Sequence, residues 1–311
     1  MRLKHIDILR GTAAILVTIF HLTGSSGLSK STASFGKYGF VGVEMFFVIS
    51  GFILPYSLHK SKYQLKNFFA FCGKRILRIY PPYIASIAIS LVVSLFIGTI
   101  SINWRAVLLH FVFLNSVFGY NDYSAVFWTL KVEVVFYLFI GLTFHHLVTV
   151  NNRSVILILF LLGLPFFYID VFFIFWMPFF TLGILLYNKM FTAMKPTTFW
   201  IMVAIALLVN YRLHGAATVI AALAALLFLL YADLKYFPGR LGKILLWFGT
   251  ISYSLYLVHW EIGRAGVVIS RHIPLVGQFE TGRVILGIGL AMFCAYFFLP
   301  DFGKTIDAFS K

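Results

Sequence analysis

Residues 6–22, which read IDILRGTAAILVTIFHL, decide the fold, because this stretch is apolar enough to enter a bilayer. It nevertheless contains Asp7 and Arg10 near its start and His21 near its end. Ionisable groups inside a membrane cost about 2.5–3.5 kcal/mol each on insertion scales and are therefore functional candidates. At about 100° per residue, Arg10 and His21 return to one helical face. The alternative is that Arg10 anchors the helix at the cytoplasmic interface and His21 meets the opposite headgroups.

Composition extends this conclusion to the whole chain. Of its 311 residues 61% are hydrophobic and 11% are charged, and the mean hydropathy is +0.94. In soluble domains about a quarter of the residues are charged, so we predict instead an all-α, polytopic transmembrane helical bundle. The net charge of +15 does not indicate a nucleic-acid partner, because the basic residues lie mostly between apolar stretches. There they indicate topology and contacts with lipid headgroups or phosphorylated ligands. Cys72 and Cys294 have no metal-ligand spacing, and no metal site is predicted.

The apolar stretches and the basic residues between them predict the topology. The densest basic cluster follows the second stretch and should be cytoplasmic, which places the N-terminus inside as well. Treating 105–148 as one net crossing places the later basic residues inside too. We therefore expect about ten crossings, both termini in the cytoplasm, and a re-entrant segment at 105–120. No linker divides the chain, so residues 1–311 are expected to form a single domain. The stretches are 6–22, 39–57, 80–100, 105–120, 125–148, 154–168, 171–188, 197–213, 215–232, 244–261 and 282–300.

Two motifs follow the first stretch. In GFVGVEMFFVISGFIL (39–54), Glu44 lies beside small glycines that let helices approach closely, so this segment is expected to pack against the first helix. Glu44 is either a structural partner of a basic group or part of a site. In FCGKRILRIYPPY (71–83), Arg75 and Arg78 lie on one helical face with Lys74 adjacent. Their guanidinium groups suit phosphate or carboxylate, and the alternative is an ordinary positive-inside cap.

Later motifs add further polar groups. In VFWTLKVEVVFYL (126–138), Glu133 and Tyr137 stand one helical turn apart, and Lys131 cannot face Glu133 from two residues away. Glu133 therefore needs another partner, such as a histidine, an arginine or water. In ISYSLYLVH (251–259), Tyr256 and His259 share a face, although a lone histidine there is more typical of a polar anchor. This inventory is compatible with group transfer and equally with proton-coupled transport.

Taken in order, the five motifs resemble those of acyltransferase family 3, a family of membrane-bound O-acyltransferases. They are IDILRGTAAILVTIFH, GFVGVEMFFVISGFIL, FCGKRILRIYPPY, VFWTLKVEVVFYL and ISYSLYLVH. Proteins of this family move an acyl group, usually acetyl from acetyl-CoA, to a hydroxyl of a glycan or another acceptor. The resemblance implies an O-acetyltransferase of a bacterial-type inner membrane. It also implies acyl-CoA, a carbohydrate acceptor such as O-antigen or exopolysaccharide, and membrane lipid as partners. Acetyl-CoA would be a substrate, with no cofactor bound permanently.

The resemblance also implies roles for individual residues. His21 would be the catalytic histidine, as general base or acyl carrier, with Arg10 as its partner and Glu133 as the carboxylate that orients it. Arg75 and Arg78, with Lys74, would bind the phosphates of the donor. Candidate oxyanion or acceptor contacts are Tyr137, Tyr256 and Glu44. The C-terminal LPDFGK departs from the glutamate-arginine-proline-phenylalanine turn of many members, and Asp301 is a candidate replacement.

Two other classes compete with acyl transfer. A transporter or flippase would use His21 and Glu133 as a proton relay and would consume no acyl-CoA. A scaffold for polysaccharide export would tolerate alanine at His21. The sequence leaves open the acceptor and its hydroxyl, the identity of the acyl group, direct transfer against an acyl-histidine intermediate, and the oligomeric state.

Overall fold

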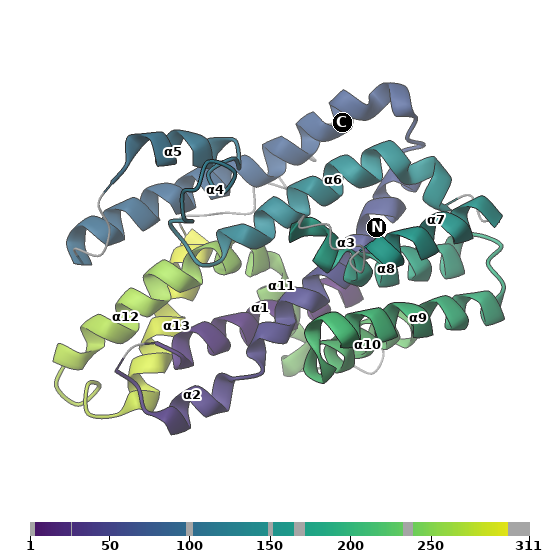
Figure 1. Cartoon of the computed structure of the whole chain (residues 1–311). Coiled ribbons are helices and arrows are strands. Elements are labelled where there is room, and N and C mark those ends of the chain that lie inside the picture. The colour runs from purple at the N-terminus through teal and green to yellow at the C-terminus, as the bar shows by residue number, and fades with distance from the viewer. Residues whose placement is uncertain are drawn as a thin grey trace. The chain divides into compact units, whose positions relative to one another are not determined.

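The computed structural model describes residues 4–25, 27–97, 102–148, 152–164, 172–232 and 239–297, and this part of the chain is helical without strands (Figure 1). The predicted all-α class is therefore confirmed. The α-helices are α1 (Lys4–Thr23), α2 (Lys30–Gly36), α3 (Gly42–Lys60), α4 (Phe68–Ile97), α5 (Trp104–Phe111), α6 (Phe127–Val148), α7 (Asn152–Gly163), α8 (Phe172–Phe191), α9 (Pro196–His214), α10 (Ala216–Tyr231), α11 (Arg240–Val258), α12 (Arg264–Ile269) and α13 (Glu280–Phe297). Short 3₁₀ turns are η1 (Gly39–Val41), η2 (Leu65–Asn67) and η6 (Ser270–His272), and η5 (His259–Gly263) is a π-helix.

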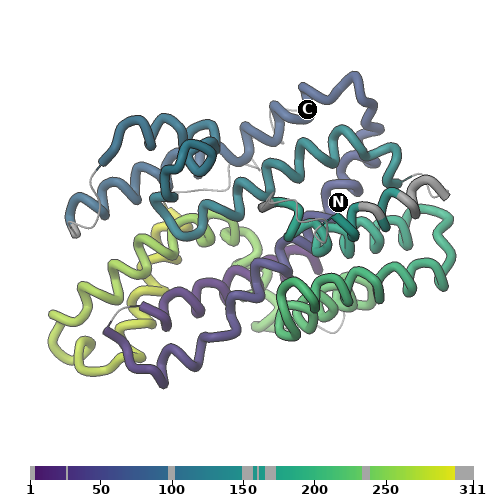
Figure 2. The backbone as a smooth tube through the Cα atoms, viewed as in Figure 1, coloured from purple at the N-terminus to yellow at the C-terminus, as the bar shows by residue number. Residues whose placement is uncertain are grey.

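Eight helical segments within the described ranges are long and apolar enough to cross a membrane. The sequence led us to expect about ten crossings, and that number stays a prediction. Of the other expected spans, α10 has only 16 residues, and α7 covers only part of 154–168, whose last residues lie outside the described ranges (grey in Figure 2). The eight are Lys4–Thr23, Lys30–Lys60, Leu65–Phe96, Phe127–Val148, Phe173–Phe191, Pro196–His214, Arg240–His272 and Glu280–Phe297.

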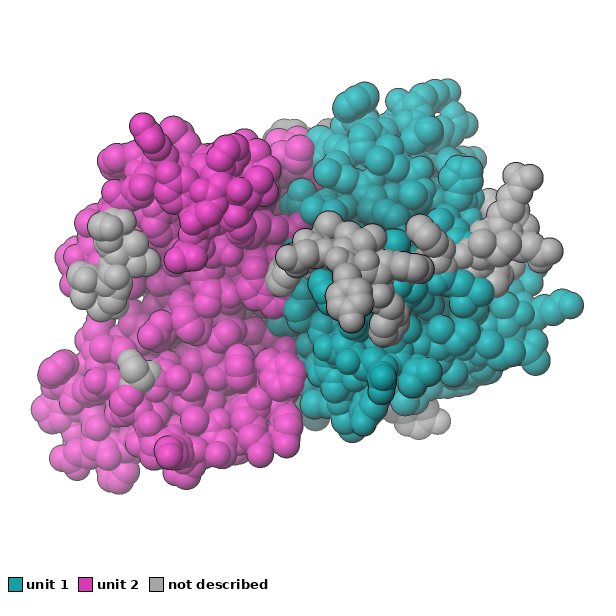
Figure 3. Space-filling model, viewed as in Figure 1, with its two compact units in different colours: residues 1–13, 41–73, 132–249 teal, residues 14–40, 74–131, 250–311 magenta. Residues whose placement is uncertain are grey.

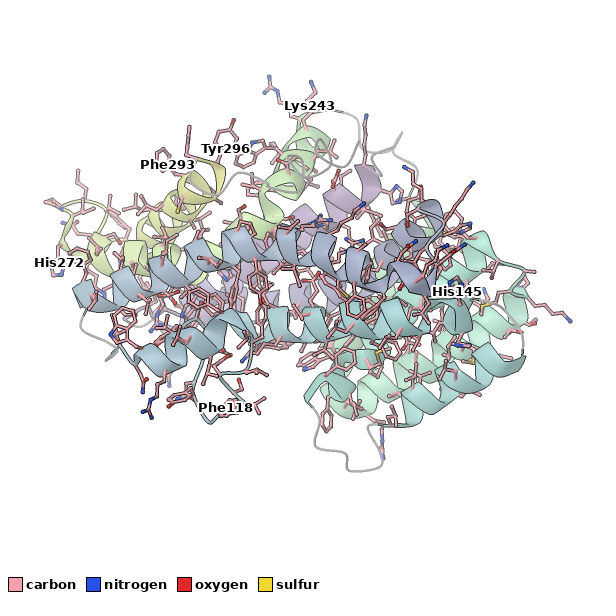
Figure 4. All side chains as sticks on the ribbon, turned by 90° about the horizontal axis from the view of Figure 1, so that it is seen from above. Phe118, His145, Lys243, His272, Phe293 and Tyr296 are labelled. Atoms are coloured by element: carbon pink, nitrogen blue, oxygen red, sulfur yellow. The ribbon has the colours of Figure 1, made fainter. Side chains whose placement is uncertain are left out.

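The segment predicted to be re-entrant begins with α5, whose 8 residues are too few to cross a bilayer. The turns after it are closed by polar contacts, in which Asp122 accepts hydrogen bonds from Lys131 (2.8 Å) and Asn115 (2.9 Å). The His110 imidazole lies within this network, and burial lowers its pKa. Phe118, labelled in Figure 4, is 62% exposed at the tip of the turns. Half-insertion of this segment stays a prediction.

Exposed aromatic side chains on α13 agree with a lipid-facing helix. Phe293 and Tyr296 are 54% and 50% exposed and project from this helix in Figure 4. In a soluble protein such a surface would favour aggregation, whereas in a membrane it meets acyl chains and headgroups.

The described chain forms two compact units, coloured separately in Figure 3. Unit 1 comprises residues 1–13, 41–73 and 132–249, and unit 2 comprises residues 14–40, 74–131 and 250–311. Helices α1, α4, α6 and α11 each contribute residues to both units. The single domain expected over residues 1–311 stays a prediction.

In unit 1 the backbones of α3 and α8 approach so closely that only glycine fits between them. A Cβ atom at Gly51 would lie 2.1 Å from the carbonyl oxygen of Phe180, and one at Gly183 would lie 2.2 Å from that of Val48. Around this crossing the ring of Phe180 packs at 4.0 Å between centroids against Phe136. Helix association in lipid depends on such close packing, because the membrane supplies no hydrophobic driving force between helices.

We expect Gly183→Ala to lower the free energy of unfolding by about 1–3 kcal/mol, the usual cost of overpacking. The added methyl group would push against backbone, which cannot rotate away as a side chain can. The measurement is the thermal unfolding midpoint of the detergent-solubilised protein. Gly73→Ala is the matched control, because a Cβ atom there meets nothing within 4 Å. An unchanged midpoint for Gly183→Ala would contradict the close approach.

In unit 2, hydrogen bonds join the segment after α1 to the start of α13. The carboxylate of Glu280 accepts hydrogen bonds from the backbone N–H of Ser29 (2.8 Å), the Ser29 hydroxyl (2.7 Å) and the Thr32 hydroxyl, which places α2 beside α13 (Figure 1). Arg283 donates to the carbonyl oxygen of Gly27 at 3.1 Å. These bonds hold the chain just beyond His21.

The expectation that the second motif packs against the first helix is confirmed at its start. A Cβ atom at Gly39 in η1 would lie 2.2 Å from the carbonyl oxygen of Leu16 in α1. The absence of a side chain at Gly39 therefore lets the two backbones touch five residues before His21.

Candidate active site

The site is built around a short π-helix, η5, which follows α11 and leads into α12. In a π-helix the backbone hydrogen bonds span five residues instead of the four of an α-helix, so it changes which side chains share a face, and such segments occur frequently at functional sites. Gly263 at the end of η5 packs against Gly287 of α13, and a Cβ atom at Gly287 would lie 2.5 Å from the Gly263 carbonyl oxygen. The close contact fixes the position of the π-helix.

Two histidines meet in unit 2. The ring centroids of His21, in the last turn of α1, and His259, the first residue of η5, are 5.2 Å apart with planes inclined by 35°. Trp260 contacts His21 from the side, with centroids 4.8 Å apart and planes at 84°. His21 is half-buried, whereas His259 is fully buried. The first and the last of the five motifs therefore supply adjacent imidazoles.

The buried His259 has one satisfied and one unsatisfied nitrogen. Its Nδ1 lies 3.1 Å from the carbonyl oxygen of Leu255, and its Nε2 is buried without a hydrogen-bond partner. The ring of Tyr256 lies 5.7 Å away between centroids, and the Tyr256 hydroxyl is hydrogen-bonded to that of Thr129 at 2.8 Å. A buried polar atom without a partner is uncommon and calls for an explanation.

A cation and a carboxylate complete the surroundings of η5. The guanidinium carbon of Arg264 lies 4.7 Å from the centroid of the Trp260 ring, a cation–π arrangement. The positive charge of Arg264 lies close enough to His21 and to Glu261 to interact electrostatically with both side chains. The half-buried carboxylate of Glu261 lies beside the buried hydroxyl of Ser124. In the described residues, no three His, Cys, Asp or Glu side chains converge as a metal site would require.

The predicted donor-binding residues lie on α4, which continues through Pro81 and Pro82 without a break. Arg75 is half-buried, and Lys74 and Arg78 are exposed. Because the helix is continuous, Arg75 and Arg78 share one face and present two guanidinium groups one turn apart. All three residues belong to unit 2, as do His21 and Tyr256.

The other predicted residues belong to unit 1. There the hydroxyl of Tyr137 donates to the Glu133 carboxylate at 2.5 Å, so the partner of Glu133 is the tyrosine one helical turn away in the sequence. Glu44 is buried near the start of α3, and its Oε2 has no hydrogen-bond partner. Arg10 is half-buried in α1.

Sequence reasoning missed three residues of this site and undervalued a fourth. Trp260, Glu261 and Arg264 were assigned no role, and His259 was read as a polar anchor. One signal was present, since HWEIGR places three ionisable residues within six positions at the end of an apolar stretch. The expected span ended at residue 261, which left Arg264 outside it.

Comparison with known proteins agrees with the motifs. The family described as "Acyltransferase domain" (acyltransferase family 3) matches residues 3–300. A protein of Acidianus two-tailed virus named "Putative acetyltransferase ORF330" is 28% identical over 301 residues, covering 88% of this chain and 89% of that relative. No solved structure matches the chain.

Proposed function

The chain belongs to acyltransferase family 3, and from this premise we propose that it moves an acyl group from acyl-CoA to a hydroxyl of a cell-surface or exported glycan. Acetyl is the proposed group, as in the name of the viral relative. The enzyme is proposed to act in a bacterial-type inner membrane with both termini in the cytoplasm. Eight helices long enough to cross support the membrane part of this proposal.

One observation supports the reaction most directly, the His21 imidazole held against His259 and Trp260. A neutral imidazole can take a proton from a hydroxyl, and positioned general bases accelerate reactions by about 10²–10⁴-fold. His21 is the proposed base, and its role as an acyl carrier is the competing route. The half-buried position of His21 leaves part of the ring accessible to reactants.

We propose that acyl-CoA, the acyl donor, binds to α4. Acyl-CoA carries phosphates, for which Lys74, Arg75 and Arg78 offer cationic donors on one stretch of helix. The exposed Lys74 and Arg78 are accessible to a soluble ligand. Acetyl-CoA is thus a substrate, and we propose no permanently bound cofactor.

The remaining candidates retain their predicted roles. Glu133, hydrogen-bonded to Tyr137, is the proposed carboxylate that supports the base, with Arg10 as the partner of His21 from the same helix. The oxyanion that develops on the thioester carbonyl needs hydrogen-bond donors, and Arg10, Tyr137 and Tyr256 are the candidates. Glu44 is a candidate acceptor contact, because its Oε2 is buried without a hydrogen-bond partner.

The test is mass spectrometry of glycans from cells with and without the protein. An acetyl-sized increment that requires the protein would establish O-acetylation and identify the acceptor at once. If no glycan changes although the protein is inserted, lipids and small molecules should be examined next. Movement of a substrate across the membrane without acyl-CoA consumption would instead favour the transporter.

A glycine on α13 offers a second prediction. We expect Gly287→Ala to lower the rate of acyl transfer by about 10²-fold, because displacement of a reacting group by about 1 Å has effects of that size. The new methyl group would meet the Gly263 carbonyl oxygen and displace the π-helix that bears His259. Gly289→Ala on the same helix is the control, since a Cβ atom there meets nothing within 4 Å. Equal rates for the two variants would contradict a role for η5 in positioning.

A further inference from the structure

We infer that His259 positions His21 by accepting a hydrogen bond from the His21 ring at its own Nε2 atom. This inference rests on the proposed function and deepens it, since it assigns a positioning residue to the same site. It starts from the contact of the two rings, whose centroids are 5.2 Å apart, and from the unpaired Nε2 of His259.

The neighbours of the two ring nitrogens of His259 determine which of them carries the proton. Its Nδ1 lies 3.1 Å from the Leu255 carbonyl oxygen, which can only accept. A neutral imidazole has one N–H donor and one lone-pair acceptor, so the proton resides on Nδ1 and the lone pair on Nε2. The buried Nε2 therefore needs a donor, and the structure shows it without one.

The imidazole of His21 can supply that donor. His21 is the ring-nitrogen donor that the structure places against His259, and Trp260 restricts the His21 ring from the side. Hydrogen bonds between catalytic groups are often long without substrate and tighten when it binds. A small rotation of His21 on substrate binding would direct its N–H at Nε2 of His259 and leave its other nitrogen as the base.

The transfer of the acyl group then needs no reactant besides acyl-CoA and the acceptor hydroxyl. The acceptor hydroxyl gives its proton to the lone pair of His21 while its oxygen attacks the thioester carbonyl. The new C–O bond forms and the C–S bond breaks, and the departing thiolate takes the proton from His21 to give the free thiol. His259 keeps its own proton throughout, and its Nε2 stabilises the His21 cation that exists between these steps. The arrangement resembles a catalytic triad, and His259 takes the place beside His21 that the proposed function gives to Glu133, because neutral His21 has a single N–H to donate.

The test compares His259→Phe with His259→Gln. Phenylalanine fills the space without an acceptor, whereas the glutamine side-chain oxygen accepts a hydrogen bond. We expect His259→Phe to lower kcat by about 100-fold with an unchanged KM for acyl-CoA, and His259→Gln to recover kcat to within about tenfold of wild type. A wild-type kcat for His259→Phe, or equal loss in both folded variants, would overturn the inference.

A measurement without catalysis separates this inference from the proposed function. In histidine-labelled protein in lipid nanodiscs, ¹⁵N NMR distinguishes the two neutral tautomers, and His259→Phe identifies the His259 signals. We expect the proton of His259 on Nδ1, and a proton on Nε2 would overturn the pairing. If the Nδ1–H form is found in a protein that transfers no acyl group, the pairing is supported and the proposed function alone fails.

Discussion

Replacement of His21 by alanine is expected to reduce acyl transfer by about 10³-fold or more, the largest effect of any single substitution in this chain. The substitution removes the imidazole that is proposed to accept the proton, and general base catalysis alone contributes about 10²–10⁴-fold. It also removes the contacts of this ring with His259 and Trp260. The measurement is the rate of thiol release from acyl-CoA in membranes together with the acyl content of the glycan.

The control for this experiment is His272→Ala, because His272 is an exposed histidine in the same unit, labelled in Figure 4. We expect wild-type rates for this variant. If His21→Ala retains full transfer, both the general-base and the acyl-carrier roles of His21 are wrong. Full retention of glycan export with no acyl transfer in wild type would favour the scaffold class.

The double substitution Arg75→Ala/Arg78→Ala is expected to raise the KM for acyl-CoA by about 10²-fold or more while kcat changes little. Each hydrogen bond to a charged group contributes about 1.5–3 kcal/mol, and the exposure of Arg78 places its share at the lower end of this range. Loss of binding that is equal in the ground state and the transition state raises KM without lowering kcat. Steady-state kinetics with varied acyl-CoA is the measurement.

Two further variants test whether the rise in KM is specific to the guanidinium groups of Arg75 and Arg78. Lys66→Ala removes an exposed positive charge from the turn before α4 and should leave KM unchanged. Arg75→Lys/Arg78→Lys keeps both charges but loses the planar, bidentate geometry of guanidinium, so an intermediate KM is expected. An unchanged KM in the alanine double variant would show that the pair is an ordinary topology signal.

Composition and local pattern were sufficient to predict the all-helical class. A chain with 11% charged residues and long apolar stretches lies in a membrane, where helices satisfy all backbone hydrogen bonds within one segment. The third stretch was nevertheless placed from residue 80, whereas α4 begins at Phe68. Prolines at positions 81 and 82 favour a helix start in a sequence pattern, but the observed helix accommodates both in its interior.

The candidate site was only partly accessible from the sequence. The ionisable character of His21 within an apolar stretch singled it out, and no other part of the fold was needed for that. Its neighbours could not be found in the same way. Helical periodicity places Tyr256 and His259 on one face, but it assumes 3.6 residues per turn, and the π-helix that begins at His259 alters this for Trp260 and Glu261.

The sequence by itself thus determined which class of protein this is and which histidine to examine, since both depend on the polarity of single residues in their local stretch. Tertiary structure alone decided that His21 meets His259 and Trp260, because these residues are separated by most of the chain and no local preference brings them together. It also decided which nitrogen of His259 is left to accept a hydrogen bond. The Leu255 carbonyl oxygen, one turn earlier in the helix, pairs with Nδ1, and complete burial of the ring keeps water from Nε2.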